Sequence, residues 1–326
     1  MKDLRVYDRI SEAVGWTPLV RLGPTVDDLS CEVFAKIEFL NPMGSVKDRI
    51  ARYMIEKAMA DGRLSSGDMV VENSSGNTAM GLAMMSILEN LRCTMVVRQQ
   101  TSKEKLDCLR AMGIRLELVD GNLPPEDPES YNKKARRIAE ETPGAFFPDQ
   151  HNNRENSEAH YQTTGPEIWQ QMDGRIDYLV AGIGTGGTIC GVARYLKERD
   201  ESIKVIAVDP EGSVFFDHFH SGRHNAPAPY LLEGLGDEEV IACPDFELID
   251  DMYRVSDGEA FRTARALARR EAILGGGSSG AALWAVRRLA RQLESPARIV
   301  TIFPDSGSRY MSTIFNDEWM KERGFL

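Results

Sequence analysis

Long apolar runs are missing from this sequence. The longest ones, such as Leu179–Ile183, fall far short of the roughly 20 residues that a membrane-spanning helix needs. The first ten residues, MKDLRVYDRI, contain two aspartates and no apolar core, so they do not look like a signal peptide. We therefore expect a protein with no membrane partner that is located in the cytoplasm.

Cysteine is scarce, and its spacing excludes the common metal sites. The chain has no CxxC pair, and no group of cysteines and histidines has the spacing of a zinc site. His218, His220 and His224 lack a nearby cysteine or carboxylate pattern, so we predict that they are loop residues and that no metal is bound. Scattered cysteines suit a reducing compartment, and we expect each to be a small buried apolar residue. The five cysteines are Cys31, Cys93, Cys108, Cys190 and Cys243.

Positive charge is in deficit. The 39 Lys and Arg residues oppose 50 Asp and Glu residues, which gives a net charge of −11. Nucleic acid is excluded as the main partner, because binding phosphates needs a basic surface. The chain has 326 residues, of which 42% are hydrophobic, and it exceeds the usual size of one compact core. We therefore expect a globular protein of two domains.

Short β-branched runs alternate with longer amphipathic stretches between about residues 30 and 305. This alternation predicts an α/β fold with open, mostly parallel sheets and helices on both faces. The predicted strands are Met69–Glu72, Thr94–Val97, Arg115–Val119, Tyr178–Ile183, Lys204–Asp209 and Arg298–Phe303. The predicted helices are Asp48–Ala60, Asn77–Leu88, Ser102–Met112, Tyr131–Glu140, Glu158–Gln171, Thr188–Glu198, Glu259–Glu271 and Ala281–Leu293.

One glycine-rich turn has the chemistry of an anion site. The segment GIGTGGT from Gly182 to Thr188 follows a predicted strand and opens a predicted helix. Glycines let the backbone approach an anion, and the free N–H groups of a helix N-terminus attract it. The segment also matches the G-x-G-x-x-G fingerprint, with Asp209 ending the next strand, as an NAD-dependent dehydrogenase requires. The turn alone therefore leaves two alternatives, a phosphate cup for another cofactor or a dinucleotide site.

Three further segments place polar groups at the start of a helix. Asn41–Arg49 puts Lys47 at a loop-to-helix junction, where the helix dipole favours the neutral amine that condenses with an aldehyde. Ser74–Thr78 gathers hydroxyls and an amide around backbone N–H groups, although alone it is also typical of a helix cap. Gly275–Gly280 repeats this arrangement. Four such turns in one α/β chain indicate a functional site.

With these segments, the chain resembles a known family across nearly its whole length. The matching motifs are WTPLVRL at Trp16, NPMGSVKDR at Asn41, SSGNTAMGLAM at Ser74, HYQTTGPEIW at His160, GTGGT at Gly184, GGSSG at Gly276 and PDSGSRY at Pro304. They resemble the fold-type II pyridoxal-phosphate enzymes, specifically the cysteine synthase and cystathionine β-synthase group. The resemblance implies a tryptophan-synthase-β-like fold of two α/β domains. The smaller domain, residues 41–148, would carry the asparagine loop, and residues 1–40 and 149–326 would form the larger cofactor-binding domain.

The resemblance also implies roles for individual residues. Lys47 matches the lysine that forms a Schiff base with pyridoxal 5′-phosphate and moves the Cα proton. Asn77 matches the asparagine that binds the cofactor's phenolic oxygen, and Ser278 matches the hydroxyl facing its pyridine nitrogen. The residues that match the phosphate cup are Gly184, Thr185, Gly186, Gly187 and Thr188. Those that match the receptor of the substrate carboxylate are Ser74, Ser75, Thr78 and Gln150.

The implied activity is β-replacement on L-serine or an activated serine through an α-aminoacrylate intermediate. A neutral serine at the pyridine nitrogen reduces the electron-withdrawing power of the cofactor, which suits elimination followed by addition. PDQHNNREN at Pro148, EGLG at Glu233 and the tail after Pro304 look more like cystathionine β-synthase, which adds homocysteine. TTGPEIW is common in cysteine synthases, which add sulfide to O-acetyl- or O-phosphoserine.

Several departures from both patterns leave the nucleophile open. Met43, Ser74 and Ala79 replace the residues usual in the family. The segment DEEVIAC after Gly236 lacks the usual aromatic-Ile-Pro run, which lies near the second-substrate entrance in the family. An enzyme that adds an amine is therefore a further alternative. An NAD-dependent dehydrogenase would leave Lys47, Asn77 and Ser278 unexplained. The resemblance implies a homodimer acting on small amino acids, and we expect neither haem nor an adenosyl effector.

Overall fold

The computed structural model describes residues 6–124, 127–223 and 225–326. The chain divides into two compact units, and within the described residues each has its own sheet. Unit 1 comprises Met1–Val14 and Asn41–Glu155, and unit 2 comprises Gly15–Leu40 and Asn156–Leu326. Both units combine a mainly parallel sheet with helices on its two faces, which confirms the predicted α/β fold class.

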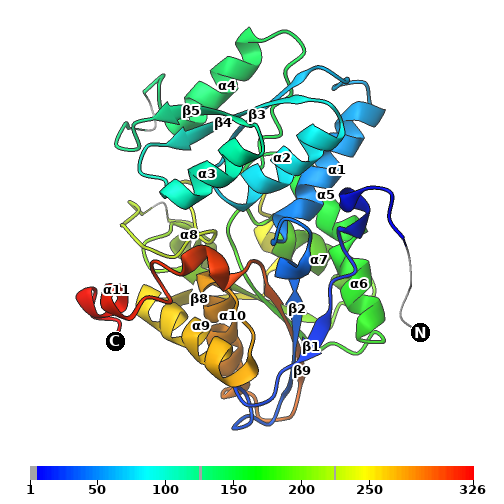
Figure 1. Cartoon of the computed structure of the whole chain (residues 1–326). Coiled ribbons are helices and arrows are strands. Elements are labelled where there is room, and N and C mark those ends of the chain that lie inside the picture. The colour runs from blue at the N-terminus through cyan, green and yellow to red at the C-terminus, as the bar shows by residue number, and fades with distance from the viewer. Residues whose placement is uncertain (1–5, 125–126, 224) are drawn as a thin grey trace. The chain divides into compact units, whose positions relative to one another are not determined.

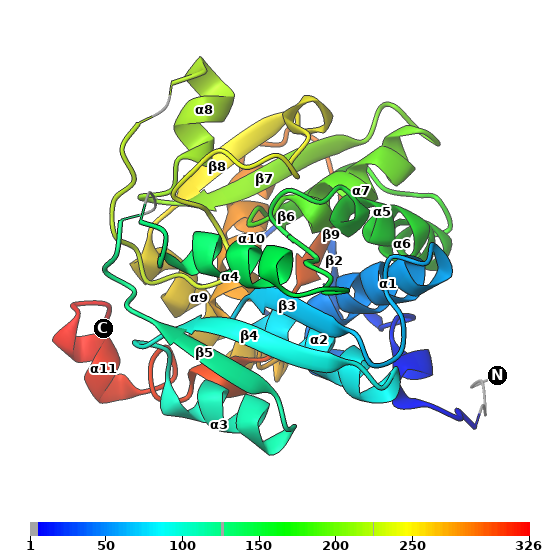
Figure 2. The ribbon, with the colours of Figure 1, turned by 90° about the horizontal axis from the view of Figure 1, so that it is seen from above.

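Unit 1 is built on the parallel sheet β3-β4-β5, covered by helices on both faces (Figures 1 and 2). Residues alternate along a strand, so Val70 and Met95 point to one face while Val71 and Val96 point to the other. The first face packs on α1, α2 and α3, and the second packs on α4. The elements are 3-10 helix η1 (Ile10–Ala13), α1 (Lys47–Ala60), β3 (Met69–Asn73), α2 (Asn77–Leu88), β4 (Arg92–Arg98), α3 (Lys103–Ala111), β5 (Arg115–Val119) and α4 (Tyr131–Glu141).

Unit 2 is built on a six-stranded sheet in the order β1-β2-β9-β6-β7-β8, in which only β1 is antiparallel to its neighbour. Its strands are β1 (Leu19–Arg21), β2 (Glu32–Ile37), β6 (Tyr178–Gly182), β7 (Lys204–Pro210), β8 (Asp251–Val255) and β9 (Arg298–Phe303). Its α-helices are α5 (Glu155–Gln162), α6 (Thr164–Gln171), α7 (Gly187–Lys197), α8 (Phe215–Ser221), α9 (Asp257–Glu271), α10 (Gly277–Ala290) and α11 (Asp317–Glu322). Three 3-10 helices complete it, η2 (Glu38–Leu40), η3 (Phe246–Leu248) and η4 (Gly307–Tyr310).

The faces of this larger sheet again follow strand alternation. Val180 and Val208 point toward α9 and α10, whereas Leu179 and Ala207 point toward α6, α7 and α8. Each face therefore has an apolar core of its own, as expected of a parallel sheet buried on both sides.

Two helix predictions are wrong in their bounds. The stretch 158–171 forms two helices, because Pro166 lacks the N–H group that would continue the first helix into the second. The helix predicted from Ala281 begins at Gly277, so the glycine- and serine-rich turn forms its first turn. Strands β1, β2 and β8 and helices α8 and α11 were not predicted.

Three predictions about single residues also need correction. His218 and His220 belong to α8 and are not loop residues, whereas His224 lies outside the described residues. Cys108 is exposed on α3, although the other four cysteines are buried as expected. It occupies the solvent side of a helix that is buried only at Leu106 and Leu109.

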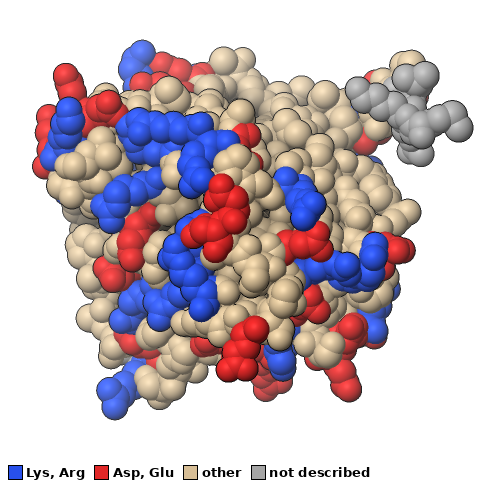
Figure 3. Space-filling view, turned by 90° about the horizontal axis from the view of Figure 1, so that it is seen from below, with Lys and Arg blue, Asp and Glu red and all other residues tan. Residues whose placement is uncertain are grey.

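Two features are absent from the part of the chain that the structure describes. No helix there is long and apolar enough to cross a membrane. No group of three or more His, Cys, Asp and Glu side chains among them could hold a metal ion. Figure 3 shows Lys and Arg side chains alternating with Asp and Glu over one face of the molecule.

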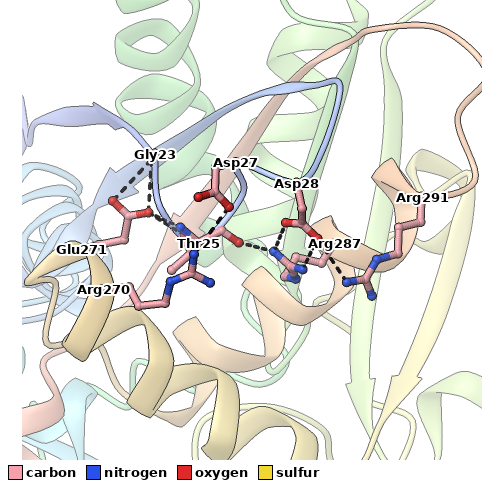
Figure 4. A network of polar contacts seen from close by, with 8 residues as sticks. All are labelled: Gly23, Thr25, Asp27, Asp28, Arg270, Glu271, Arg287 and Arg291. Atoms are coloured by element: carbon pink, nitrogen blue, oxygen red, sulfur yellow. Dashed lines mark hydrogen bonds and ion pairs between the residues drawn. The ribbon is translucent and has the colours of Figure 1, made fainter.

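A polar network fastens the loop between β1 and β2 to helices α9 and α10 (Figure 4). Glu271 accepts hydrogen bonds from the N–H of Gly23 (3.1 Å) and from the N–H and hydroxyl of Thr25 (both 2.7 Å). Arg287 donates to both carboxylate oxygens of Asp28, at 2.8 and 2.6 Å, and lowers the pKa of Asp28 to about 2. The last residue of α9 therefore satisfies backbone groups of a loop that is 246 residues away in sequence.

Unit 1 buries a carboxyl group at the end of its first strand. Glu72 is fully buried, and it accepts hydrogen bonds from the N–H of Asn73 (3.0 Å) and the N–H of Gln150 (3.3 Å). Burial raises the pKa of Glu72 from 4.5 to about 8, against the opposing effect of these two N–H groups. Glu72 therefore links the end of β3 to the segment that carries Gln150.

We predict that Glu271→Ala lowers the free energy of unfolding of unit 2 by about 1 to 3 kcal/mol, because it leaves the Gly23 and Thr25 donors without their acceptor. Arg270→Ala is the matched control, since its ion pair with Asp27 is exposed and 3.4 Å long, and it should cost less than about 1 kcal/mol. Urea unfolding followed by tryptophan fluorescence reports on unit 2, where all four tryptophans lie. Equal losses in the two variants would contradict the assignment.

We predict that unit 1 loses stability as the pH rises from about 4.5 to about 8. Below this window Glu72 is protonated in both the folded and the unfolded chain. Within it the unfolded chain releases the proton and the folded chain keeps it, which favours unfolding. Hydrogen-exchange protection of β3, corrected for the intrinsic pH effect, should fall with pH in the wild type and less in Glu72→Gln. Glu104→Gln, on the exposed side of α3, should follow the wild type. Parallel pH profiles for wild type and Glu72→Gln would contradict the prediction.

Candidate active site

The predicted carboxylate-binding residues of unit 1 meet at the end of β3. The chain runs outward from β3 to β4 and β5, and then returns to the other side of β3, where Phe146 pairs with Val70 in parallel. Ligands of open parallel sheets bind at such a switch point, outside the carboxyl ends of the strands. Ser74 and Ser75 follow β3 directly, and the Thr78 hydroxyl donates to the Gln150 side chain at 2.6 Å. The structure thus brings Thr78 and Gln150 together across 72 residues of sequence.

Lys47 and Asn77 each begin a helix, and these two helices pack closely. Lys47 is the first residue of α1 and Asn77 is the first residue of α2, and both are partly exposed. A Cβ added at Gly81, one turn after Asn77, would lie 2.9 Å from the Ala51 Cβ and 3.1 Å from the Lys47 carbonyl oxygen. The absence of a side chain at Gly81 therefore lets the first turns of the two helices approach each other.

The predicted residues of unit 2 gather at a second switch point. The chain runs from β6 to β7 and β8, and then returns to β9 on the opposite side of β6, with all four strands parallel. The segment Gly184–Thr188 follows β6 and opens α7. The turn before Ser278 pairs with the chain just after β9 through a bridge between Gly275 and Ser306. The sheet topology therefore places the phosphate cup and the Ser278 turn at the carboxyl ends of neighbouring strands.

The glycines of the cup are required by close packing. A Cβ at Gly184 would lie 2.4 Å from the Gly234 carbonyl oxygen, and one at Gly187 would lie 1.9 Å from Asn156 Oδ1. Gly186 has a φ of +78°, which favours glycine. No side chain in the described part of the chain caps α7 at Gly186. The first N–H groups of α7 therefore have the geometry and the dipole to receive an anion.

A buried pair supports the Ser278 turn. Ser278 is the second residue of α10 and is 5% exposed. The N–H of Gly276 donates to the Asp305 carbonyl oxygen at 3.0 Å, and the Tyr310 hydroxyl donates to Asp305 Oδ2 at 2.7 Å. Burial and the adjacent Asp305 carboxylate raise the pKa of Tyr310 well above its usual value. These contacts fix the start of α10 against the segment that follows β9.

The dinucleotide alternative lacks the acid that it needs. A dinucleotide site uses an accessible carboxylate at the end of the second strand to bind a ribose. Asp209 occupies that place in sequence but is fully buried, and its Oδ2 accepts from the Phe216 N–H at 2.9 Å. Burial raises the pKa of Asp209 to about 7. The Asp209 side chain accepts from the second residue of α8, so it is not placed to bind a ribose.

Sequence reasoning missed the polar groups that lie behind the site. Glu72 accepts from the backbone of Gln150, and Asn156 and His160 contact the hydroxyls of Thr185 and Thr188. All three side chains are fully buried. Asn156 and His160 belong to the motifs PDQHNNREN and HYQTTGPEIW, and their spacing of one helical turn was a usable signal. Glu72 was predicted only as the last residue of a strand, and the sequence pattern assigns no function to a carboxyl group there.

The residues present fit a pyridoxal-phosphate cofactor. Unit 1, taken by itself, contains an amine and an amide at helix starts. Unit 2, taken by itself, contains a helix N-terminus, two partly exposed hydroxyls and a buried serine. These are the groups that a phosphorylated aldehyde with a pyridine ring requires.

Comparison with known proteins agrees with this set of groups. Residues 10–305 match the family of pyridoxal-phosphate dependent enzymes. The cystathionine beta-synthase of Apis mellifera is 41% identical over 324 residues, which cover 99% of this chain and 64% of that protein. The mouse (Mus musculus) cystathionine beta-synthase is 40% identical over 327 residues, which cover 100% of this chain and 58% of that protein. The cysteine synthase of Staphylococcus aureus strain Mu50 is 40% identical over 307 residues, which cover 94% of this chain and 96% of that protein.

The chain thus spans less than two thirds of the curated cystathionine beta-synthases that it matches, but nearly the whole cysteine synthase. The resemblance inferred from the motifs is confirmed. This chain belongs to the family of pyridoxal-phosphate dependent enzymes.

Proposed function

We propose that this protein catalyses β-replacement on L-serine or an activated serine, with Lys47 as the catalytic lysine. The observation that carries the proposal is the placement of Lys47 and Asn77 at the starts of two helices in contact through Gly81. Both cystathionine beta-synthases and cysteine synthases among its relatives support this class of reaction. When bound, the cofactor withdraws electrons from the substrate Cα, and the side chains of the protein do the remaining work.

In unit 1, each proposed residue has a physical task. Lys47 would hold the cofactor through its side-chain amine, and the same amine would take the Cα proton of the substrate and later return it. Asn77 would hold the cofactor ring through the phenolic oxygen. Ser74, Ser75, Thr78 and Gln150 receive the substrate carboxylate. The Thr78–Gln150 hydrogen bond and the contact of Glu72 with the Gln150 backbone hold this receptor in one geometry before substrate binds.

In unit 2, the segment Gly184–Thr188 anchors the phosphate through backbone N–H groups and hydroxyls. Ser278 would face the pyridine nitrogen as a neutral partner, and the contacts of Asp305 with Gly276 and Tyr310 hold its turn in place. A neutral partner would not stabilise a proton on that nitrogen, which would suit loss of a β-substituent.

We propose homocysteine as the nucleophile, which makes the enzyme a cystathionine β-synthase. PDQHNNREN, EGLG and the tail after Pro304 support this choice, as do the names of the relatives that the chain matches over 99–100% of its length. Sulfide is the alternative, and the 40% identity to a cysteine synthase over 307 residues supports it. An amine nucleophile is the third possibility, because the segment after Gly236 departs from both groups.

We further propose that the protein acts as a homodimer in the cytoplasm. All five cysteines are free thiols, which suits a reducing compartment. The dimer rests on the family resemblance.

We predict that Lys47→Ala loses turnover by about 10²- to 10⁴-fold or more, because the variant has no amine to move the Cα proton. It should keep part of its cofactor through the phosphate cup, but borohydride should no longer fix the cofactor to the chain. Lys57→Ala, near the other end of α1 and 41% exposed at its side chain, is the matched control and should retain both properties. Mass spectrometry of the reduced protein and steady-state kinetics give the two readouts. Near-normal turnover of Lys47→Ala would show that the lysine is assigned wrongly.

We predict that kcat/KM is higher for homocysteine than for sulfide or for a panel of amino-acid amines, with serine, acetylserine and phosphoserine compared as first substrates. A site built to pair with the amine and carboxylate of homocysteine rejects thiols lacking these charges, because its own polar groups would stay unpaired. A strong preference for sulfide would identify a cysteine synthase, and a strong preference for an amine would remove the enzyme from sulfur metabolism.

A further inference from the structure

Both hydroxyls of the phosphate cup contact a buried polar side chain of α5. The Asn156 amide nitrogen lies 2.9 Å from Thr185 Oγ1, and His160 Nε2 lies 3.1 Å from Thr188 Oγ1. Asn156 and His160 are fully buried, whereas Thr185 and Thr188 are partly exposed. Each of the two partly exposed hydroxyls of the cup therefore contacts a polar side chain in the interior of unit 2.

Two glycines of α7 hold the helices in this register. A Cβ at Gly187 would lie 1.9 Å from Asn156 Oδ1, and a Cβ at Gly191 would lie 2.2 Å from the Ser157 carbonyl oxygen and 2.8 Å from the His160 Cβ. Asn156 and His160 are one helical turn apart, and so are Gly187 and Gly191. The close contact between α5 and α7 thus extends over two turns of each helix.

The direction of these hydrogen bonds decides what the hydroxyls can do. A hydroxyl group has one proton to donate and can also accept. Because the Asn156 amide group donates to Thr185, the threonine does not use its own proton in this contact. The Thr188 hydroxyl likewise accepts in its contact, and does not use its own proton there, only if His160 carries its ring proton on Nε2. In the other tautomer the Thr188 proton would be spent on the imidazole ring.

On the opposite side of the ring, a second hydroxyl group can set the Nε2–H tautomer by donating to Nδ1. His160 Nδ1 lies 2.8 Å from the Thr164 hydroxyl oxygen. When Thr164 donates to Nδ1, the ring proton resides on Nε2 and is donated to Thr188. Thr164, His160 and Thr188 then form a chain of hydrogen bonds with one direction, which ends at the cup.

We propose that Asn156 and His160 are positioning residues for the cofactor phosphate, which hold the Thr185 and Thr188 hydroxyls as acceptors so that both donate their protons to phosphate oxygens. His160 acts as the Nε2–H tautomer, set by Thr164. The inference rests on the proposed function, because the phosphate is the ligand that these hydroxyls would receive. It adds two residues to the site that do not touch the cofactor themselves.

The first test separates binding of the phosphate from binding of the ring. The full-length protein, freed of cofactor, is titrated with pyridoxal phosphate and with pyridoxal, which lacks the phosphate. His160→Phe and the isosteric Asn156→Asp should each weaken pyridoxal phosphate about tenfold or more, the effect of losing one hydrogen bond, and leave pyridoxal unchanged. His160→Gln keeps a donor that can reach Thr188 and should restore most of the affinity. Gln162→Ala, exposed on the same helix, is the matched control and should bind both as the wild type does.

The second test reads the tautomer directly and does not depend on activity. Nitrogen NMR of histidine-labelled holoprotein should show His160 with its proton on Nε2, with the signal assigned by its loss in His160→Gln. Thr164→Val removes the donor to Nδ1 and should shift the population toward the other tautomer. A His160 proton on Nδ1 in the wild-type holoprotein would overturn the proposal. This measurement needs only the wild type, so it tests the proposal whether or not the substituted variants fold.

The outcomes distinguish this inference from the proposed function. A wild-type protein that binds no pyridoxal phosphate contradicts the proposed function. A wild type that binds it through Lys47, with variants that weaken pyridoxal and pyridoxal phosphate equally, leaves the function intact and overturns the positioning role.

Discussion

In each unit, the order of parallel strands is the constraint on which the placement of the proposed site residues depends. In each unit the chain leaves one strand in one direction and returns on that strand's other side, at β3 in unit 1 and at β6 in unit 2. Connections of this kind open a space at the carboxyl end of that strand, where no crossover covers it. A helix begins almost directly after each of these strands, so the N–H groups of its first turn face the same space. The geometry suited to an anion thus follows from topology before any side chain is considered.

Close helix contacts then place individual groups within that frame. Gly81 brings α2 against the first turn of α1, where Lys47 lies, and Gly187 and Gly191 bring α7 against α5. A methyl group added at any of these three glycines would push the two packed helices apart, and each pair of helices carries proposed functional residues. Buried polar side chains complete the arrangement, with Glu72 on the Gln150 backbone and Asn156 on Thr185. Such buried groups are costly unless they are hydrogen-bonded, so their geometry is well defined.

Sequence patterns predicted several strands and helices with their bounds. β5, β9 and α2 have the predicted bounds, and the helix starts at Lys47 and Gly187 differ by one residue. β2 was missed because Lys36 interrupts its apolar run. That lysine is buried and paired with Glu167 at 2.7 Å, a partner from α6 that no local pattern reveals. The break between α5 and α6 was missed although Pro166 marks it.

By itself, the sequence determined the family, the cofactor class and the residues proposed to touch the cofactor, because short motifs at strand-to-helix turns carry that chemistry within a few residues. Only the tertiary structure decided which buried polar groups contact the proposed site residues. Glu72 and Gln150 are 78 residues apart, Thr185 and Asn156 are 29 apart, and Asp209 was removed from the dinucleotide role by its burial. Hydrogen-bond partners of this kind are selected by the packing of distant elements, and neither composition nor periodicity records which elements will pack together.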